Sequence, residues 1–403
     1  MGHPAPAARW DLCLKELSQR SCGSPSEIGG HGRGNCAASL VSFPSLNSPR
    51  VAASWLCASI PGIFGTDTTM TANPNPWQVG ATIRKAYTKK YCLAPDAGES
   101  TCSGGIVKAH SVQEALLRKI ARYGHVYRAD TALENYHKNP GRITYKLVGV
   151  NLASSFTGFC NLHDTKIFAP LETASFAAGP EPCFLLAYRA VCREVFVKRA
   201  VLENAEWLVR NAPAPNLELA TANLALTKVA IRDLEWHKNA YDRDLRTSNF
   251  GAIEWVCIEL SSTPDLACSG LCHPDYDFAG KKLQDLSDLK TRMELVTFSV
   301  IPTDQGGAIV FAWHSTSGRT GWQLVASLGA LDNSLLPHAI VRFAFSYSDN
   351  LCLSPAWWDS LPADARNALQ RRSFVAASPD FPADGTWLLD DGLRLVNWPV
   401  GRR

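Results

Sequence analysis

The clearest hydrophobic pattern in the chain predicts a helical hairpin over residues 181–247. Apolar residues on both arms recur at the three- and four-residue spacing that places side chains on one face of a helix. They are Phe184, Tyr188, Val191 and Val195 on the first arm, and Leu219, Leu226, Ala230 and Leu234 on a second arm over 217–245. The loop 211–216 contains two prolines and joins the arms. Charged residues fill most other positions, so we expect the outer faces to be exposed to solvent.

After residue 252 the pattern changes to one that is typical of strands. Stretches rich in β-branched and aromatic residues predict strands at 253–262, 294–302, 308–314 and 338–346. The turn between the second and third stretches falls at Gln305-Gly306-Gly307. Pro355 predicts the start of a closing helix within 354–372, because proline is favoured in the first helical turn.

The segment 76–180 combines short helical and extended patterns. Apolar spacing predicts a helix over 111–124, with Ser111 as its N-cap, Glu114 as the capping-box partner and Gly124 as its end. Residues 143–156 predict a strand or hairpin arm. Helices and strands are therefore segregated along the chain, which indicates an α+β fold.

Residues 1–69 differ from the rest of the chain. They are rich in Ser, Gly, Pro and Ala and show no sustained period of 2 or 3.6. We expect a disordered extension, with Met70 as a candidate translation start, and discount Cys13, Cys22, Cys36 and Cys57 as ligands. The predicted order of domains is then a zinc-knuckle domain at 76–180, the hairpin at 181–247 and a β-rich C-terminal domain with a closing helix at 248–403.

Composition narrows the class of protein. No run of about 18 apolar residues predicts a membrane span, and the first residues lack a signal-peptide pattern. The 13 cysteines are dispersed along 403 residues rather than arranged as a disulfide framework. We therefore expect a cytoplasmic protein with reduced thiols, in which paired cysteines favour metal binding. No glycine-rich phosphate loop or Gly-x-Ser-x-Gly motif is present.

Two pairs of residues in 76–180 have metal-ligand character. They are Cys92-x9-Cys102 and Cys160-x2-His163, and His110 lies between them. Zinc takes four sulfur or nitrogen ligands in a tetrahedron, usually as two short pairs that the fold brings together. We predict a structural zinc ion held by these four residues. In the alternative, His110 is the fourth ligand and His163 is free.

Positive charge is concentrated near the first pair. The chain as a whole has a net charge of +3, whereas residues 84–128 contain nine Lys/Arg and three Asp/Glu, a local balance of +6. This segment is either a solvated basic face or a surface that contacts phosphates. Arg84, Lys85, Lys89 and Lys90 are the candidate nucleic-acid-binding residues, with DNA or RNA as the partner.

The order Cys…Cys, His110, Cys160-x2-His163-Asp164 resembles the HNH (ββα-metal) nucleases, which carry structural zinc in a treble-clef-like frame. The resemblance covers about 90 residues, and strings such as AHSVQ, GHVY and SSFTGFCNLHD are also similar to strings that occur together in bacterial proteins. It implies that His110 is the general base for phosphodiester hydrolysis and that Asp164, with His125, holds a catalytic Mg²⁺ or Mn²⁺. Lys166 falls near the family's trailing basic residue.

The chain departs from this family in four ways. The first cysteines are nine residues apart rather than two, Ala109 replaces a carboxylate before His110, 49 residues separate His110 from Cys160, and the second pair ends in histidine. These departures favour an alternative, a non-catalytic zinc-stabilised protein that binds nucleic acid or protein. A third hypothesis is a protein-interaction component that acts through its β-rich half.

Other candidate sites are weaker. Cys268-x3-Cys272-His273, with Cys257 upstream, has spacing for a second metal site, but buried free cysteines explain it equally well. Four aspartates between 275 and 288 are typical of turns and caps. Trp357-Trp358 are interpreted as core anchors, with base stacking as the alternative.

Overall fold

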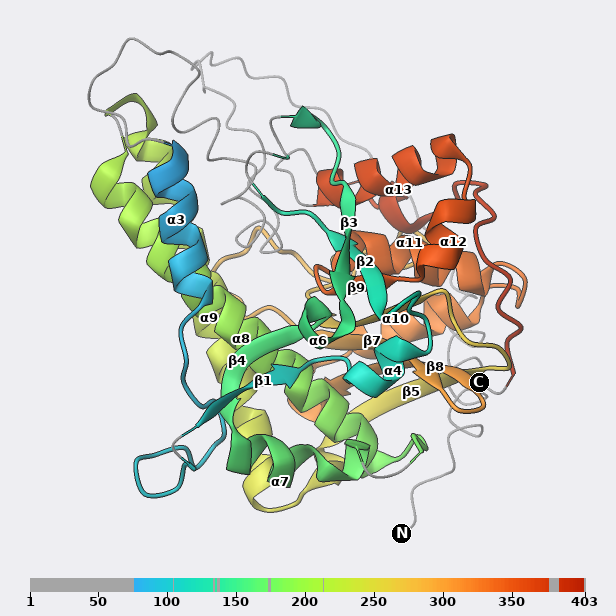
Figure 1. Ribbon diagram of the computed structural model, residues 1–403, viewed down its shortest axis with the longest axis horizontal. Coiled ribbons are helices and arrows are strands. Elements are labelled where there is room, and N and C mark those ends of the chain that lie inside the picture. The colour runs from blue at the N-terminus through green and yellow to red at the C-terminus, as the bar shows by residue number, and fades with distance from the viewer. Residues whose placement is uncertain are drawn as a thin grey trace, which may run out of the picture.

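The computed structural model describes residues 76–401, except 104, 133–134, 136–137, 173–174, 213 and 377–383, and describes only the backbone of 76–80, 83 and 215. The expectation for residues 1–69 lies outside the described residues. The α+β class is confirmed, because helices and antiparallel strands both form the body of the protein (Figure 1). None of the helices in the described ranges has the length and apolarity that crossing a membrane requires.

The segment 76–172 forms short elements rather than long ones. They are α3 (Pro76–Tyr87), β1 (Ile106–His110), α4 (Glu114–Arg118), β2 (His125–Ala129), β3 (Tyr145–Gly149), α6 (Val150–Ala153), β4 (Ser155–Cys160) and α7 (Asn161–Glu172).

The helix expected over 111–124 is limited to α4, so its predicted cap is wrong. The hydroxyl of Ser111 is buried and donates to the Ser154 carbonyl at 3.0 Å instead of capping a helix. Gly124 does not end a helix either. It has φ +72° and lies with Tyr123 in the two-residue turn whose flanking residues, Arg122 and His125, pair through backbone hydrogen bonds.

The predicted helical hairpin is confirmed. It consists of α8 (Pro180–Asn211) and α9 (Leu217–Arg246), joined by η1 (Ala214–Asn216). Pro180 in the first turn of α8 and the apolar face that includes Phe184, Tyr188 and Val191 explain why this segment forms a helix that packs against the sheet.

The C-terminal part contains most strands and the last helices. They are η2 (Phe250–Ala252), β5 (Ile253–Leu260), β6 (Leu266–Cys272), β7 (Val296–Thr303), β8 (Gly306–His314), η3 (Ser315–Ser317), α10 (Thr320–Gly329), α11 (Leu336–Tyr347), β9 (Leu351–Leu353), α12 (Pro355–Ser360), α13 (Ala363–Ala376) and η4 (Thr386–Leu388).

Two expectations for this part need correction. The stretch 338–346 is not a strand but the centre of α11, where every residue is buried, so no polar side marks a helical period. The closing helix is two helices, because Leu361-Pro362 separates α12 from α13 and the residue before a proline disfavours helical backbone.

Seven strands form one antiparallel sheet in the order β3-β2-β9-β6-β7-β8-β5. Its strands come from both the 76–180 and 248–403 segments, because β2 pairs with β9 through Tyr127 and Leu353. β1 and β4 form a separate two-stranded antiparallel sheet.

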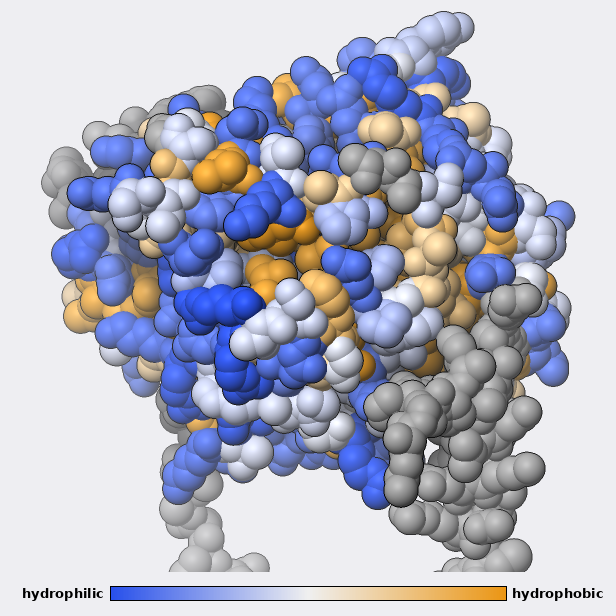
Figure 2. Space-filling model, turned by 90° about the horizontal axis from the view of Figure 1, so that it is seen from below, coloured by the Kyte–Doolittle hydropathy of each residue, from blue (hydrophilic) through white to orange (hydrophobic). Residues whose placement is uncertain are grey.

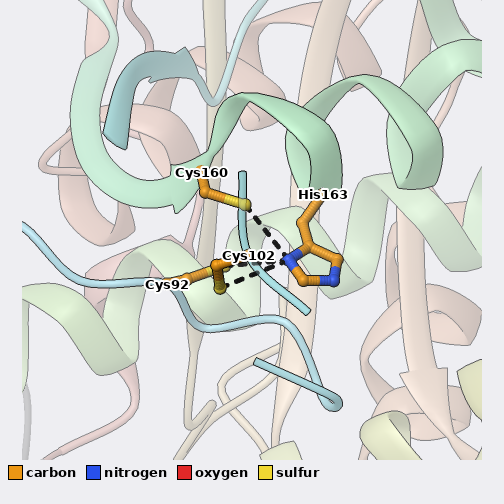
Figure 3. A group of neighbouring side chains, drawn as sticks. All are labelled: Cys92, Cys102, Cys160 and His163. Atoms are coloured by element: carbon orange, nitrogen blue, oxygen red, sulfur yellow. Dashed lines mark hydrogen bonds between the residues drawn. The ribbon is translucent and has the colours of Figure 1, made fainter. Parts of the chain in front are cut away.

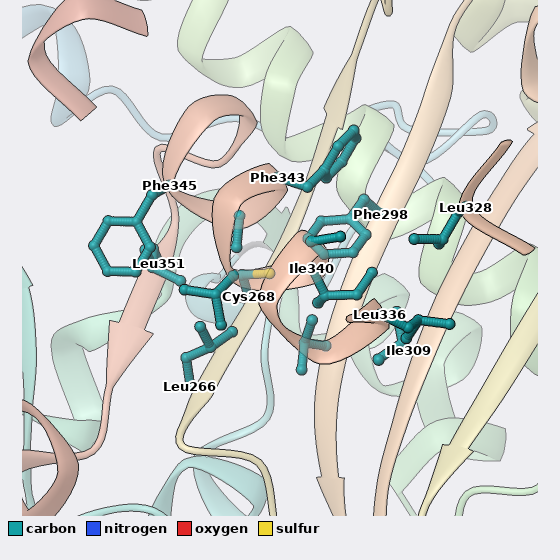
Figure 4. Packing of buried hydrophobic residues seen from close by; sticks show 14 of the residues in the cluster. Leu266, Cys268, Phe298, Ile309, Leu328, Leu336, Ile340, Phe343, Phe345 and Leu351 are labelled. Atoms are coloured by element: carbon teal, nitrogen blue, oxygen red, sulfur yellow. The ribbon is translucent and has the colours of Figure 1, made fainter. Parts of the chain in front are cut away.

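Helices cover both faces of the large sheet, with α8 and α9 on one side and α10 to α13 on the other (Figure 1). Side chains of β8 show this alternation. Ala308, Val310 and Ala312 join the core that contains α8, whereas Ile309, Phe311 and Trp313 join the core that contains α10 and α11. Figure 4 shows the second core, where Phe298 of β7 lies against Phe343 of α11 with ring centroids 4.9 Å apart.

Two buried histidines connect α9 to neighbouring segments. His314 at the end of β8 accepts from the backbone N–H of Thr316 at Nδ1, so its Nε2–H donates to Asp244 of α9 at 2.7 Å. His237 of α9 lies 2.8 Å from the Met293 carbonyl through Nε2 and is 1 % exposed. Burial lowers the pKa of His237 to about 4.

This lowered pKa predicts a loss of stability in mild acid. The unfolded chain, with a histidine pKa near 6.5, binds a proton before the folded chain does. Neutral His237 therefore contributes fully to the free energy of unfolding above about pH 6.5. This contribution, about 3 kcal/mol, is lost as the pH falls from 6.5 toward 4. Urea unfolding of the wild type and of His237→Gln between pH 7 and 4 measures it. The difference between the two proteins should shrink with acid, and an unchanged difference contradicts the prediction.

Candidate metal centre

The four predicted zinc ligands come together at one end of the β1–β4 sheet (Figure 3). Cys92 lies between α3 and β1, Cys102 precedes β1, Cys160 is the last residue of β4, and His163 is in the first turn of α7. One ligand atom of each residue lies within 4.8 Å of those of the other three. This group can hold a metal ion, and its fourth member is His163 rather than His110.

The distances within the group suit a tetrahedral ion. Nδ1 of His163 is 3.4 Å from Sγ of Cys92, 3.7 Å from Sγ of Cys102 and 3.2 Å from Sγ of Cys160. A zinc ion with ordinary Zn–S and Zn–N bonds separates its sulfur and nitrogen ligands by about 3.5 Å across a tetrahedral angle. The three S–N distances lie on both sides of this value, so the position of His163 relative to the three sulfurs suits a zinc ion.

Backbone hydrogen bonds hold the ligand-bearing segments together. The segment before β1 runs beside β4, because the N–H of Leu93 donates to the Gly158 carbonyl at 2.9 Å. Directly before β1, at the same end of the pair, the N–H of Asn161 donates to the Gly105 carbonyl at 2.9 Å. The first turn of α7 is tied to the segment after Cys102 by a bond from Leu162 N–H to Ser103 Oγ.

The thiols of the group differ in acidity. Burial raises the pKa of the Cys92 thiol to about 11. Burial also disfavours the Cys160 thiolate, but hydrogen bonds from His163 and Ser103 outweigh it and lower the pKa of Cys160 to about 6. Cys160, which directly precedes α7, therefore ionises before Cys92, and a bound cation would favour the thiolate form of its ligands.

His110 lies away from this group. It pairs with Ser155, whereas Cys160 pairs with Ile106, so four residues of β1, or about 13 Å, separate His110 from the level of the ligands. The Ser154 hydroxyl donates to the Val112 carbonyl and accepts from His110 Nδ1 at 3.2 Å, which leaves Nε2 with the lone pair. Burial lowers the pKa of His110, partly offset by Glu114, so the ring is neutral near pH 7.

Asp164 follows a metal ligand but lies beside a buried cation. Its Oδ1 is buried and has no hydrogen-bond partner among the described residues. Burial raises the pKa of Asp164, and the positive charge of Arg189 acts in the opposite direction. Arg189 is 1 % exposed, donates to Glu172 at 2.8 Å and lies 4.0 Å above the Phe168 ring.

His125 is exposed on β2 and belongs to the large sheet, where it pairs with Gly149. Its Nδ1 donates to the Tyr123 carbonyl at 2.8 Å. No second group of three or more potential metal ligands occurs within the part of the chain that the structure describes. The structure therefore does not assemble His110, Asp164 and His125 into a cation site.

Several of the basic residues in 84–128 are neutralised by acidic residues from other segments. Lys89 pairs with Glu203 at 2.7 Å, Lys119 contacts Asp304, and Arg122 contacts Asp359. In the described residues Arg84, Lys85 and Lys90 are exposed and form no ion pair. Figure 2 shows hydrophilic residues over most of the lower face of the molecule, with apolar residues gathered in a band across it.

The other candidate sites have structural roles. Cys257 on β5 is separated from Cys268 and Cys272 on β6 by two strands of the sheet, so they do not form a metal group. The aspartates at 277, 285 and 288 accept backbone N–H bonds in turns, as expected. The expectation that Trp357-Trp358 are core anchors is confirmed by their burial.

Two functional candidates were not predicted from the sequence. Asp96 lies 3.2 Å from the outer nitrogen of His163, and Arg189 lies beside Asp164. No protein family, curated protein or solved structure matches the chain.

Proposed function

We propose that Cys92, Cys102, Cys160 and His163 bind one structural Zn²⁺. The three S–N distances lie close to the value expected for a tetrahedral zinc ion. Three sulfurs and one nitrogen would also fill all four coordination positions, which leaves none for a substrate. The ion would hold β1, β4 and α7 together as an HNH-like, treble-clef-like unit. A cytoplasmic location is part of this proposal, because thiolate ligands need a reducing compartment.

We further propose that this unit is non-catalytic and that the protein binds nucleic acid. The observation that carries the first part is that the described residues do not bring His110, Asp164 and His125 together as a cation site. The buried guanidinium of Arg189, whose positive charge acts on Asp164, adds to this. A fixed positive charge in a poorly solvated region repels a divalent cation strongly. The guanidinium of Arg189, which donates to Glu172, favours the ionised form of Asp164 and disfavours a divalent cation near it.

The exposed cations near the zinc centre support the second part. Arg84 and Lys85 in the last turn of α3 and Lys90 two residues before Cys92 carry charges that no acidic side chain neutralises in the described structure. Lysine and arginine in such positions contact phosphates of DNA or RNA without reading the sequence. The zinc ion would hold this basic segment in a fixed place.

Binding to a labelled DNA duplex and a labelled single-stranded RNA, followed by anisotropy at several salt concentrations, tests the proposal. Replacing Lys85 and Lys90 with Gln is expected to weaken binding and to lower the slope of log affinity against log salt by about one per removed contact. Lys89→Gln is the matched control, because Lys89 is already paired with Glu203 and should change the slope little. Absence of salt-dependent binding to either nucleic acid contradicts the proposal.

The second candidate is the HNH-like phosphodiester hydrolase. The observation that favours it is the neutral ring of His110 with an available Nε2 lone pair, which is the state a general base needs. The same nucleic acids incubated with Mg²⁺ or Mn²⁺ decide between the two. The non-catalytic proposal expects intact strands, whereas cleavage that depends on the cation and disappears in His110→Ala establishes the hydrolase.

A further inference from the structure

The side of His163 that faces away from the three sulfurs contacts a carboxylate. Nε2 of His163 lies 3.2 Å from Oδ1 of Asp96. The His163 side chain is only 5 % exposed, whereas that of Asp96 is 54 % exposed, so the carboxylate covers the outer edge of the ring at the protein surface. Both nitrogens of this imidazole are therefore engaged, one toward the ligand group and one toward Asp96.

Asp96 is held there by the loop between Cys92 and Cys102. The loop folds back on itself, because Ala97 N–H donates to the Ala94 carbonyl at 3.1 Å and Cys102 N–H donates to the Gly98 carbonyl at 3.0 Å. The Thr101 hydroxyl donates to the carbonyl of Asp96 itself. Arg246 at the end of α9 donates to the neighbouring Pro95 carbonyl and ties the loop to the helix.

The chemistry of imidazole gives this contact a role. A neutral histidine offers a metal one lone pair and carries its proton on the other nitrogen. Coordination through Nδ1 requires the proton on Nε2, and a carboxylate that accepts from Nε2–H fixes this tautomer, orients the ring and makes Nδ1 a stronger donor.

We infer that Asp96 is a positioning residue that orients His163 for zinc, and that the long Cys92–Cys102 spacing exists to carry it. This inference rests on the proposed zinc site. A two-residue spacing would leave no chain to return a carboxylate to His163, whereas the nine-residue loop places Asp96 four residues after the first ligand and six before the second.

Competition with a chromophoric zinc chelator tests the inference on the full chain. Asp96→Ala is expected to weaken zinc binding by about 10- to 100-fold, which is the usual effect of removing such a partner. Asp96→Asn retains a hydrogen-bond acceptor without the charge and should lie between Asp96→Ala and the wild type. Glu99→Gln is the matched control, since Glu99 is an exposed acid in the same loop and is expected to bind zinc like the wild type.

A spectroscopic readout separates positioning from a general effect on folding. In ¹⁵N-labelled, zinc-loaded protein, His163 should show a metal-bound Nδ1 and a protonated Nε2, and Asp96→Asn should shift the Nε2–H resonance while the remaining spectrum stays unchanged. Equal zinc affinity of the wild type and Asp96→Ala overturns the inference but leaves the zinc site intact. A wild-type protein that binds no zinc overturns both the inference and the zinc proposal.

Discussion

Removal of zinc with a strong chelator is expected to lower the free energy of unfolding by several kcal/mol. An ion present at a thousand times its dissociation constant stabilises the folded state by about 4 kcal/mol. The loss should be greatest around β1, β4 and the start of α7, because the ion joins segments that are otherwise connected by few backbone hydrogen bonds. Urea unfolding with and without zinc, combined with hydrogen exchange, measures the size and the location of the effect.

A cysteine outside the centre provides the control for this experiment. Cys102→Ser should reproduce the effect of the chelator, whereas Cys257→Ser, at a partly exposed cysteine on β5, should retain zinc-dependent stability. Equal stability of the wild type with and without zinc would show that the ion has no structural role.

The second large effect is expected at Arg189. Arg189→Met should destabilise the fold by about 2 kcal/mol, because it removes the buried guanidinium that donates to Glu172 and whose charge acts on Asp164. Methionine keeps much of the contact with the Phe168 ring, so the change isolates charge from packing. Urea unfolding at pH 7 measures the difference.

Glu172→Gln is the companion to this variant. The Glu172 side chain is 43 % exposed, so its ion pair with Arg189 is partly screened and its removal should cost roughly 1 kcal/mol or less. If Arg189→Met is as stable as the wild type, the buried guanidinium does not stabilise this region, and its charge would not keep a divalent cation from Asp164.

Elements with one polar side were predictable from the sequence, and elements without one were not. The hairpin of α8 and α9 follows from apolar residues on one face. α11 lacks that signal, because its residues from Leu336 to Ser346 are buried on all sides, and its β-branched and aromatic content then resembles a strand. The pairing of β2 with β9 depends on contacts between residues more than two hundred positions apart, which no local pattern records.

In the metal centre, too, some residues could be predicted from the sequence and others could not. Cysteine and histidine pairs are chemically distinctive, so the four members of the metal group could be predicted before their positions were known. Asp96 lies in a loop whose sequence resembles any polar turn, and only its distance from His163 reveals a role. The outer faces of the hairpin were expected to be exposed to solvent, but Arg189 of α8 is buried and contacts Glu172 and Phe168 of α7.

The most direct measurement is the metal content of the purified full chain and of Cys160→Ser by elemental analysis. Cys160 is buried, its thiol pKa is lowered to about 6, and its Sγ lies 3.2 Å from His163 Nδ1, so its loss should remove one ligand without a substitute. We predict one zinc per wild-type chain and no stoichiometric zinc in the variant. A wild-type protein without stoichiometric metal, or a variant that retains it, would contradict the proposed zinc centre.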